Sequence, residues 1–154
     1  MFHIVLVEPE IPQNTGNIAR TCAVTGAVLH LVRPLGFSVE EKQLRRAGLD
    51  YWDKLDVRYY DSFEEVERTY PAARFFLLST HAKKCYADAR YQDGDFLVFG
   101  KETAGLGPEL LRRRSADAVR IPMRSGLRSL NLSNAVALVL YEALRQNEFD
   151  GLAF

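Results

Sequence analysis

The sequence predicts an α/β fold, with a mostly parallel sheet and helices on both of its faces. Short apolar runs alternate with segments of helical pattern along the 154 residues. The apolar runs, such as His3–Val7 and Phe96–Phe99, are continuous and do not alternate between polar and apolar residues. Such strands are buried on both faces, which is typical of a parallel sheet covered by helices. No repeat, low-complexity tract or linker interrupts the chain, so we expect one domain over residues 1–154.

The first half of the chain is expected to hold three strands and three helices. A polar turn over Glu8–Gly16 separates the first strand from a short helix over Asn17–Thr25. Gly26 suits the end of that helix, because glycine adopts the left-handed conformation found there. The later elements of this half are the strand Val28–Val32, a helix over Glu40–Ala47 that ends at Gly48, the weak strand Val57–Tyr60, and a helix from the capping box Ser62-x-x-Glu65 to about Thr69.

The second half is expected to contain three more strands and two more helices. Pro108 marks the start of one helix, because proline fits the first turn, where its missing N–H is not needed. The elements in order are the strand Arg74–Ser79, a polar loop over Thr80–Gly94, the strand Phe96–Phe99, the helix from Pro108 to Arg114, the strand Ala118–Ile121 ended by Pro122, and the helix Ser133–Asn147.

The last helix is apolar in all directions over Ala135–Tyr141, which covers about two turns. A helix on one face of a sheet normally keeps a polar stripe toward water. Two interpretations remain open: a central core helix, or a helix shared between the sheet and a second subunit. We favour the shared helix, because a chain of this length has few places in which to bury a helix completely.

Composition excludes several classes of protein. The 20 Lys and Arg residues balance the 20 Asp and Glu residues, which excludes a uniformly basic nucleic-acid coat but allows a local basic patch. Cys22 and Cys85 match no CxxC spacing, so neither a disulfide framework nor a cysteine zinc site is expected, and we expect no metal. The N-terminus does not resemble a signal peptide, and no apolar run is long enough to span a membrane. We therefore expect a cytoplasmic protein.

Common nucleotide and hydrolase motifs are incomplete or missing. Gly100 and Gly105 have the spacing of a P-loop, but Leu106 stands where its lysine would be. Gly105 and Gly107 lack the third glycine of a dinucleotide-binding loop. The three histidines form no ligand pair at helical spacing, and no HExxH or GxSxG occurs.

Three segments rich in Gly, Asn and Ser lie close after expected strands, where parallel α/β sheets bind ligands. Each could be only a turn or a helix cap. Arg20 lies one turn into the expected first helix and on the same face as Asn17, which would hold a guanidinium beside a loop of amides. The segments are Asn14–Thr21, Phe99–Leu106, and Ile121–Met123 with Arg128–Asn134.

Positive charge is concentrated late in the chain. Between positions 111 and 130 there are six arginines and a single acid, Asp117, whereas Asp50–Tyr70 holds seven acids and three bases. A charge run is most often a solvated face. The separation of charge in a neutral protein also suits binding of a polyanion at one surface.

These segments resemble the three signature motifs of the SPOUT RNA methyltransferases, and the resemblance runs from Met1 to about Asn147. Within that family the chain is similar to the wobble-position tRNA 2′-O-methyltransferases, because of its opening segment and of LRRAGLDYW. The motifs are NTGNIARTC, FGKETAGL, and IPM followed by RSLNLSNAVALVLYEALRQ.

The resemblance implies a C-terminal trefoil knot, a homodimer formed through the C-terminal helix, and S-adenosylmethionine as the methyl donor. It also implies the residues of the site. The cofactor-binding residues would be Leu78, Gly100, Ile121, Met123, Ser129 and Leu130, and the catalytic residues would be Arg20, Asn14, Glu102, Ser129 and Asn131.

The implied reaction transfers a methyl group to the ribose 2′-hydroxyl of the wobble nucleotide, a cytidine or modified uridine, in tRNA, with leucine tRNA as the expected substrate. Arg20 stands close to the 2′-hydroxyl in this scheme. Arginine keeps its charge, so we expect it to orient the ribose or a phosphate and to stabilise the developing alkoxide. The expected phosphate contacts are Arg112–Arg114, Arg124 and Arg128, with Lys42, Arg45 and Arg46 as weaker candidates.

Three alternatives remain. The chain could be a catalytically silent RNA-binding homodimer with the same fold, a 2′-O-methyltransferase for another RNA site, or a flavodoxin-like binder of small nucleotides. A pure RNA binder would not need both the cofactor loops and Arg20. The arginine cluster and the apolar last helix argue against the flavodoxin-like alternative.

Overall fold

A computed structural model describes residues 1–38 and 49–154. Its six strands form one sheet in the order β3-β2-β1-β5-β4-β6, and every pair of neighbours is parallel. The α/β class and the parallel sheet are therefore confirmed. The strands are β1 (His3–Val7), β2 (Val28–Val32), β3 (Val57–Tyr60), β4 (Phe75–Leu78), β5 (Phe96–Phe99) and β6 (Ala118–Val119).

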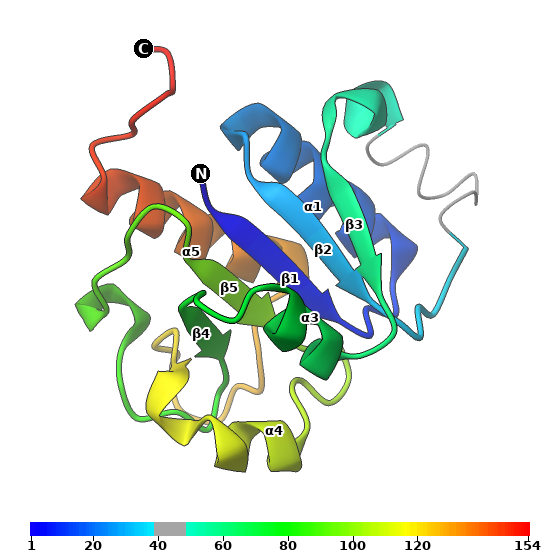
Figure 1. Cartoon of the computed structure of the whole chain (residues 1–154). Coiled ribbons are helices and arrows are strands. Elements are labelled where there is room, and N and C mark those ends of the chain that lie inside the picture. Colours follow the sequence, from blue (N-terminus) through cyan, green and yellow to red (C-terminus); the bar gives the residue numbers. More distant parts are fainter. Residues whose placement is uncertain (39–48) are drawn as a thin grey trace.

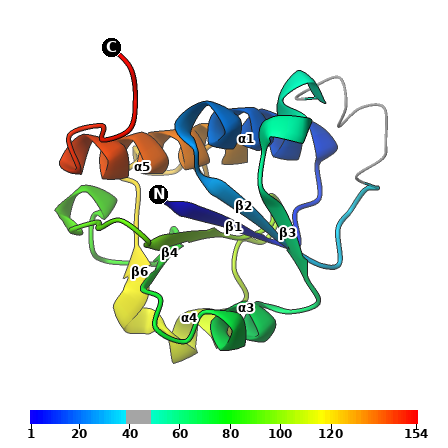
Figure 2. The same ribbon diagram turned by 45° about the horizontal axis from the view of Figure 1, so that its top comes forward.

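Helices cover both faces of the sheet. The helices α1 and α5 lie together on one face, and α3 and α4 lie on the other (Figures 1 and 2). The expected helix Glu40–Ala47 falls outside the described residues. The helices are α1 (Pro12–Thr25), α3 (Phe63–Thr69), α4 (Pro108–Arg113) and α5 (Leu132–Gln146), with short 3₁₀ turns η1 (Leu49–Lys54), η2 (Tyr86–Asp88) and η3 (Ser115–Asp117).

The alternation of side chains along each strand builds two separate core layers. Ile4 and Leu6 of β1 pack under α1 and α5, together with Val136 and Leu140 of the last helix. Val5, between them in the sequence, faces the layer under α3 and α4. All of these side chains are fully buried, which explains why the strands are apolar on every residue.

The first helix begins earlier than the sequence pattern predicts. Asn14 and Gly16 lie inside α1 and are buried, so the expected turn over Glu8–Gly16 is correct only for residues 8–11, and its later part is wrong. Pro12 occupies the first turn, and Ile11 at the N-cap offers no side-chain cap. The Glu102 carboxylate accepts hydrogen bonds from the backbone there instead, so the capping group itself leaves no local signal and Pro12 is the local sign of the helix start. Arg20 consequently lies two turns into the helix, not one.

Other boundaries follow the sequence closely. Ser62 accepts a hydrogen bond from the Glu65 backbone N–H, as the capping box predicts. Gly26 ends α1 with a φ of 77°. The strand β6 stops at Val119, short of the expected Ile121, because its partner β4 ends at Leu78. Within the described residues, no helix is both long and apolar enough to cross a lipid bilayer.

A buried polar chain links the three neighbouring strands β1, β2 and β3 beneath α3. His3 Nδ1 lies 2.9 Å from His30 Nε2, and His30 Nδ1 lies 2.8 Å from the Tyr60 hydroxyl. Burial lowers the pKa of His3 to about 4 and that of His30 to about 3. Both imidazoles are therefore neutral in the folded protein at neutral pH.

Acid should destabilise the fold through these histidines. An unfolded histidine gains its proton near pH 6.5, whereas folded His30 stays neutral down to about pH 3. Stability is thus complete above pH 6.5 and decreases as the pH falls, and His30 alone accounts for about 2 kcal/mol by pH 5. Urea unfolding of wild type and of His30→Phe between pH 7 and 5 measures how steeply the free energy of unfolding falls with pH. The free energy of unfolding of His30→Phe should depend clearly less on pH than that of wild type. The control His81→Phe, changed at an exposed position, should show the same pH dependence as wild type.

Candidate active site

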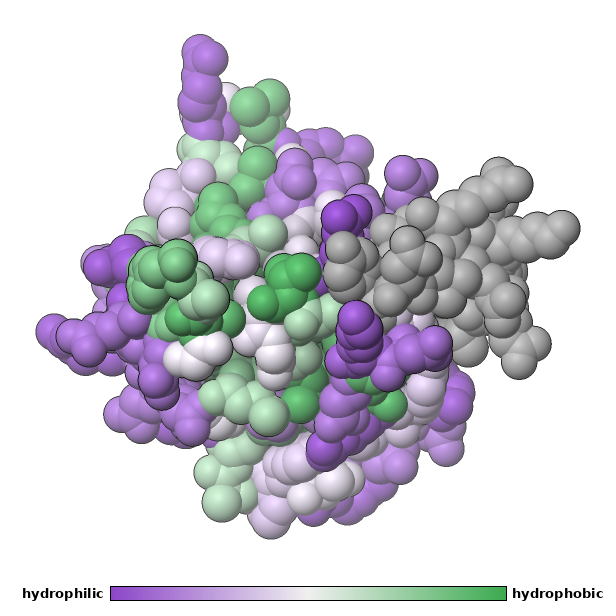
Figure 3. All heavy atoms as spheres, turned by 90° about the horizontal axis from the view of Figure 1, so that it is seen from above, coloured by the Kyte–Doolittle hydropathy of each residue, from purple (hydrophilic) through white to green (hydrophobic). Residues whose placement is uncertain are grey.

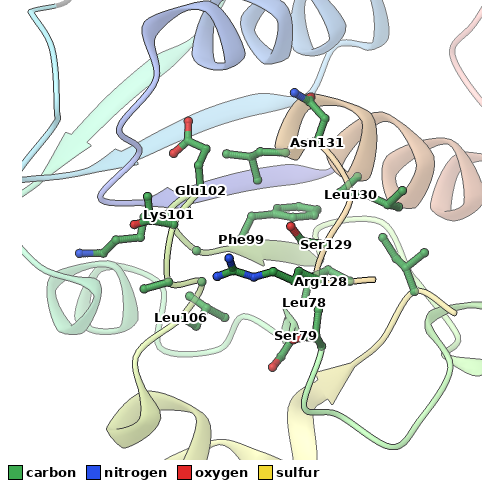
Figure 4. Close-up of a pocket in the computed structure, with 18 of the residues that line it drawn as sticks. Leu78, Ser79, Phe99, Lys101, Glu102, Leu106, Arg128, Ser129, Leu130 and Asn131 are labelled. Carbon is green, nitrogen blue, oxygen red and sulfur yellow. The ribbon is translucent and has the colours of Figure 1, made fainter. Parts of the chain in front are cut away.

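A cleft of about 600 Å³ opens at the carboxyl ends of β4, β5 and β6. Three segments that are separate in the sequence form it: residues 78–81, residues 99–106, and several residues between 121 and 135. Ile11 and Asn14 close one side from the start of α1. Figure 4 shows side chains from these segments converging on the same space. Two of the segments selected from the sequence, Phe99–Leu106 and Ile121–Met123 with Arg128–Asn134, therefore meet at this site, and the third contributes Asn14 to it.

Nine of the ten residues predicted for the site line this cleft. They comprise every predicted cofactor-binding residue and four of the five predicted catalytic residues. Arg20 does not line it and lies on the exposed side of α1. The nine are Asn14, Leu78, Gly100, Glu102, Ile121, Met123, Ser129, Leu130 and Asn131.

The cleft combines apolar walls with polar groups at its rim. Phe99, at the end of β5, lies in its middle, and Leu78 and Leu130 flank it (Figure 4). Ser79 and Ser129 supply hydroxyl groups close to these apolar side chains. An apolar pocket of this size with a few placed polar groups suits a small organic cofactor that has a flat ring and a polar tail.

A chain of hydrogen bonds ties the loop after β5 and the start of α5 to the start of α1. The Glu102 carboxylate accepts from the backbone N–H groups of Glu10 and Ile11, at 2.8 and 2.9 Å, and from Asn14 Nδ2 at 3.2 Å. Asn14 Oδ1 in turn accepts from Asn131 Nδ2 at 3.2 Å. The Asn131 side-chain oxygen caps α5, because it accepts a hydrogen bond of 2.9 Å from a backbone N–H in the first turn of that helix. Glu102 and Asn14 therefore hold the start of α1 against the start of α5.

A second contact fastens the same two loops. The Glu10 carboxylate accepts hydrogen bonds from the Thr103 backbone N–H at 3.0 Å and hydroxyl at 2.8 Å. These bonds lower the pKa of Glu10, which favours its charged form. The loop after β5 and the segment before α1 are thus joined by two carboxylates, since each segment supplies one carboxylate that accepts hydrogen bonds from the other.

Glu102→Gln should lower stability by about 1–3 kcal/mol, because the new amide group faces a backbone donor that it cannot accept from. Urea unfolding at pH 7 measures the loss. Glu109→Gln is the matched control, since the same change is made at an exposed position on α4. Equal stability of the two variants would contradict the capping role of Glu102.

The predicted phosphate-binding arginines separate into two groups. Arg113 and Arg114 both form ion pairs with Glu67 of α3, at 2.8 and 2.6 Å, so they link α4 to α3. Arg128 instead extends across the open cleft (Figure 4). Arg112 and Arg124 are exposed. The weaker candidates Lys42, Arg45 and Arg46 lie outside the described residues.

The sequence analysis missed several residues of the cleft. Phe99 and Leu106 bound the second selected segment but were given no role in the site. Ser79 was expected as the last residue of a strand, and Thr80 and His81 as part of a polar loop, yet all three follow directly after β4 and line the cleft. Their place at a strand end was the available signal. Among residues 1–38 and 49–154, no group of three or more His, Cys, Asp or Glu side chains could hold a metal ion.

Comparison with known proteins identifies the family. The model of the SpoU rRNA Methylase family matches residues 1–141, which is most of the chain. The chain belongs to the SpoU methylase family. A relative from Polaromonas sp., named tRNA (cytidine(34)-2′-O)-methyltransferase, is 51% identical over 156 residues that cover 98% of this chain and 94% of the relative. The protein of the same name from Burkholderia pseudomallei is 50% identical, covering 98% and 99%.

Solved structures agree with this assignment. One, described as giving structural insights into the 2-OH methylation of C/U34 on tRNA, has a TM-score of 0.92 at 47% identity and covers 97% of each chain. The SpoU methyltransferase AviRb from Streptomyces viridochromogenes, in complex with the cofactor AdoMet, has a TM-score of 0.85 at 27% identity. It covers 95% of this chain and 57% of its own.

Proposed function

We propose that this protein methylates the ribose 2′-hydroxyl of nucleotide 34 in tRNA, where the nucleotide is a cytidine or a modified uridine. Relatives that carry this activity in their names are about half identical over nearly the whole chain. The convergence of the three motif segments on one cleft is the observation that carries the proposal. Leucine tRNA is the substrate that we expect, and the cytoplasm is the expected compartment.

S-adenosylmethionine fits the cleft by volume and by chemistry. Leu78, Phe99 and Ile121 offer apolar surface for an adenine ring, and Ser129 and Asn131 offer polar groups for the ribose and the amino-acid tail. When bound, this cofactor supplies an electrophilic methyl group on a sulfonium. The family likeness to a structure that contains AdoMet supports the same choice.

The chain's own residues have three tasks in the reaction. The cleft aligns the two substrates, which can supply about 7–11 kcal/mol of the barrier. Glu102, Asn14 and Asn131 hold the walls in place and act as positioning residues. Arg20 orients the ribose or an adjacent phosphate and stabilises the alkoxide that develops as the hydroxyl gives its proton to a phosphate oxygen or to water.

Titration calorimetry with S-adenosylmethionine tests the cofactor site directly. We expect saturable heat with one cofactor for each cleft, and competition by S-adenosylhomocysteine. Absence of heat at millimolar cofactor would contradict the proposal.

We further propose a homodimer formed through α5. Val136, Val139 and Leu140 pack inward, but Leu138 and Tyr141 on the outer side are 37% and 43% exposed. Val24 of α1, the helix beside α5 on the same face of the sheet, is 53% exposed. Figure 3 looks on to this layer and shows apolar side chains gathered within a polar surround. Arg20 shares the exposed stripe of α1 with Val24, so the proposed interface brings a second subunit close to it.

Leu138→Asp should shift the dimer toward monomer, because a charge would be buried in the interface without a partner. Analytical ultracentrifugation measures the shift. Arg68→Asp on α3, also an exposed helix position, should leave the sedimentation coefficient unchanged. An unaltered dimer in the Leu138 variant would exclude α5 from the interface.

We also propose that the segment after β6 is threaded to form a trefoil knot, and that residues 1–154 act as one domain. The order β5-β4-β6 and the return of residues 120–131 across the cleft to α5 support this threading.

A further inference from the structure

We infer that the phosphate backbone of the RNA substrate lies along one wall of the cleft and not the other. This wall consists of residues 79–86 and 118–131, and we call it the basic wall. The inference rests on the proposed function, since it takes RNA as the substrate. It adds the side from which the RNA enters and the side chains that hold it.

The two segments of the basic wall form one continuous surface. The Ser79 N–H donates to the Val119 carbonyl at 3.0 Å, where β4 meets β6. Farther along, the Arg120 N–H donates to the Lys84 carbonyl at 2.8 Å, and the Arg120 carbonyl accepts from the Tyr86 N–H at 2.8 Å. Both segments also line the cleft, the first through residues 79–81 and the second through Ile121, Met123 and residues 128–131. The wall thus runs from the rim into the site.

The basic wall carries positive charge without acid. Neither segment contains an Asp or a Glu, although the whole chain has as many acids as bases. Across residues 1–38 and 49–154, no acidic side chain forms an ion pair with the wall's Lys and Arg side chains, and all of these are exposed. Their charge is therefore available for an anion from outside. The cations are Lys83, Lys84, Arg120, Arg124 and Arg128.

The facing wall has the opposite character. It is built from the turn after β1 and the loop after β5, which bring Glu8, Glu10 and Glu102 together. Lys101 is the single Lys or Arg in this described stretch, and its Nζ lies 3.8 Å from the Glu8 carboxylate. A polyanion is attracted to one side of such a cleft and repelled from the other.

The distribution of the cations favours RNA over a small anion. One carboxylate, such as the tail of a cofactor, can be held by a single guanidinium. Arg128 reaches into the cleft (Figure 4), whereas Lys83 and Arg124 belong to exposed stretches that do not line it. A chain of phosphates that passes from the rim to the reacting ribose would contact all three.

The test measures tRNA affinity over a series of salt concentrations, by fluorescence anisotropy, for the double variant Lys83→Glu, Arg124→Glu. We expect affinity to fall about tenfold or more and the slope of log K against log salt to decrease by about two, one for each lost phosphate contact. KM for tRNA should rise while kcat at saturating tRNA and the affinity for S-adenosylmethionine are retained. The matched control is Lys54→Glu, Arg68→Glu, which makes the same change of charge at exposed positions outside the wall.

An unchanged salt slope in the wall variant, or the same loss in the control, would overturn the inference. Circular dichroism checks the fold, and Lys83→Met with Arg124→Met repeats the test without reversed charge if the first variant unfolds. Failure of the proposed function gives a different result, because wild type would then bind RNA through the wall but transfer no methyl group to it.

Discussion

Gly100→Ala is expected to abolish binding of S-adenosylmethionine and, with it, methyl transfer. A Cβ atom at this position would collide with the backbone of Gly105 and Leu106, which cannot move aside as a flexible side chain would. The loop after β5 must therefore shift, and it forms one side of the cleft. A displacement of about 1 Å in a site of this kind can cost about 100-fold in rate. Calorimetry and a methylation assay measure the two losses.

Gly107→Ala supplies the control for this change. Gly107 lies at the other end of the same loop, has a φ of −64°, and has open space where a Cβ would be added. Its variant should bind the cofactor and turn over as wild type does. If Gly100→Ala binds the cofactor equally well, the loop does not form the binding site.

Arg20→Ala should reduce methylation by about 10²–10³-fold or more while cofactor binding survives. The change removes a cation that would stabilise the developing alkoxide, which is an interaction made in the transition state. The cofactor cleft keeps all its lining residues, because Arg20 does not line it. Calorimetry and single-turnover methylation separate the two effects.

Arg145→Ala is the corresponding control, since Arg145 is an exposed arginine on α5, in the same helical layer. This variant should lose little activity. Retained turnover in Arg20→Ala would remove the role assigned to Arg20, and loss of cofactor binding would show that the residue supports the cleft itself.

Local pattern was sufficient for most of the secondary structure. The runs His3–Val7 and Phe96–Phe99 are apolar on both faces because helices cover both, so their identity as strands was visible in composition alone. Gly26 and Ser62 carry their own chemical signals for helix ends. Pro12 was the local signal for the start of α1, but Ile11 before it carries no capping side chain, because Glu102, far away in the sequence, accepts the backbone hydrogen bonds there.

The candidate site was predictable as a set of residues but not as a geometry. Strand ends rich in Gly, Asn and Ser marked the three segments that meet in the cleft. The contact from Glu102 through Asn14 to Asn131 depends on how the sheet is ordered, which no local pattern encodes. Glu67 likewise lies too far along the chain from Arg113 for their ion pair to be inferred from the charge run.

Mapping of the methylated nucleotide tests the central claim most directly. The purified protein is incubated with tRNA and S-adenosylmethionine that carries a labelled methyl group, and the digested RNA is analysed by mass spectrometry. The account predicts label on the ribose 2′-oxygen of nucleotide 34, with none after Arg20→Ala. Label on a base, label at another nucleotide, or no transfer to tRNA at all would contradict it.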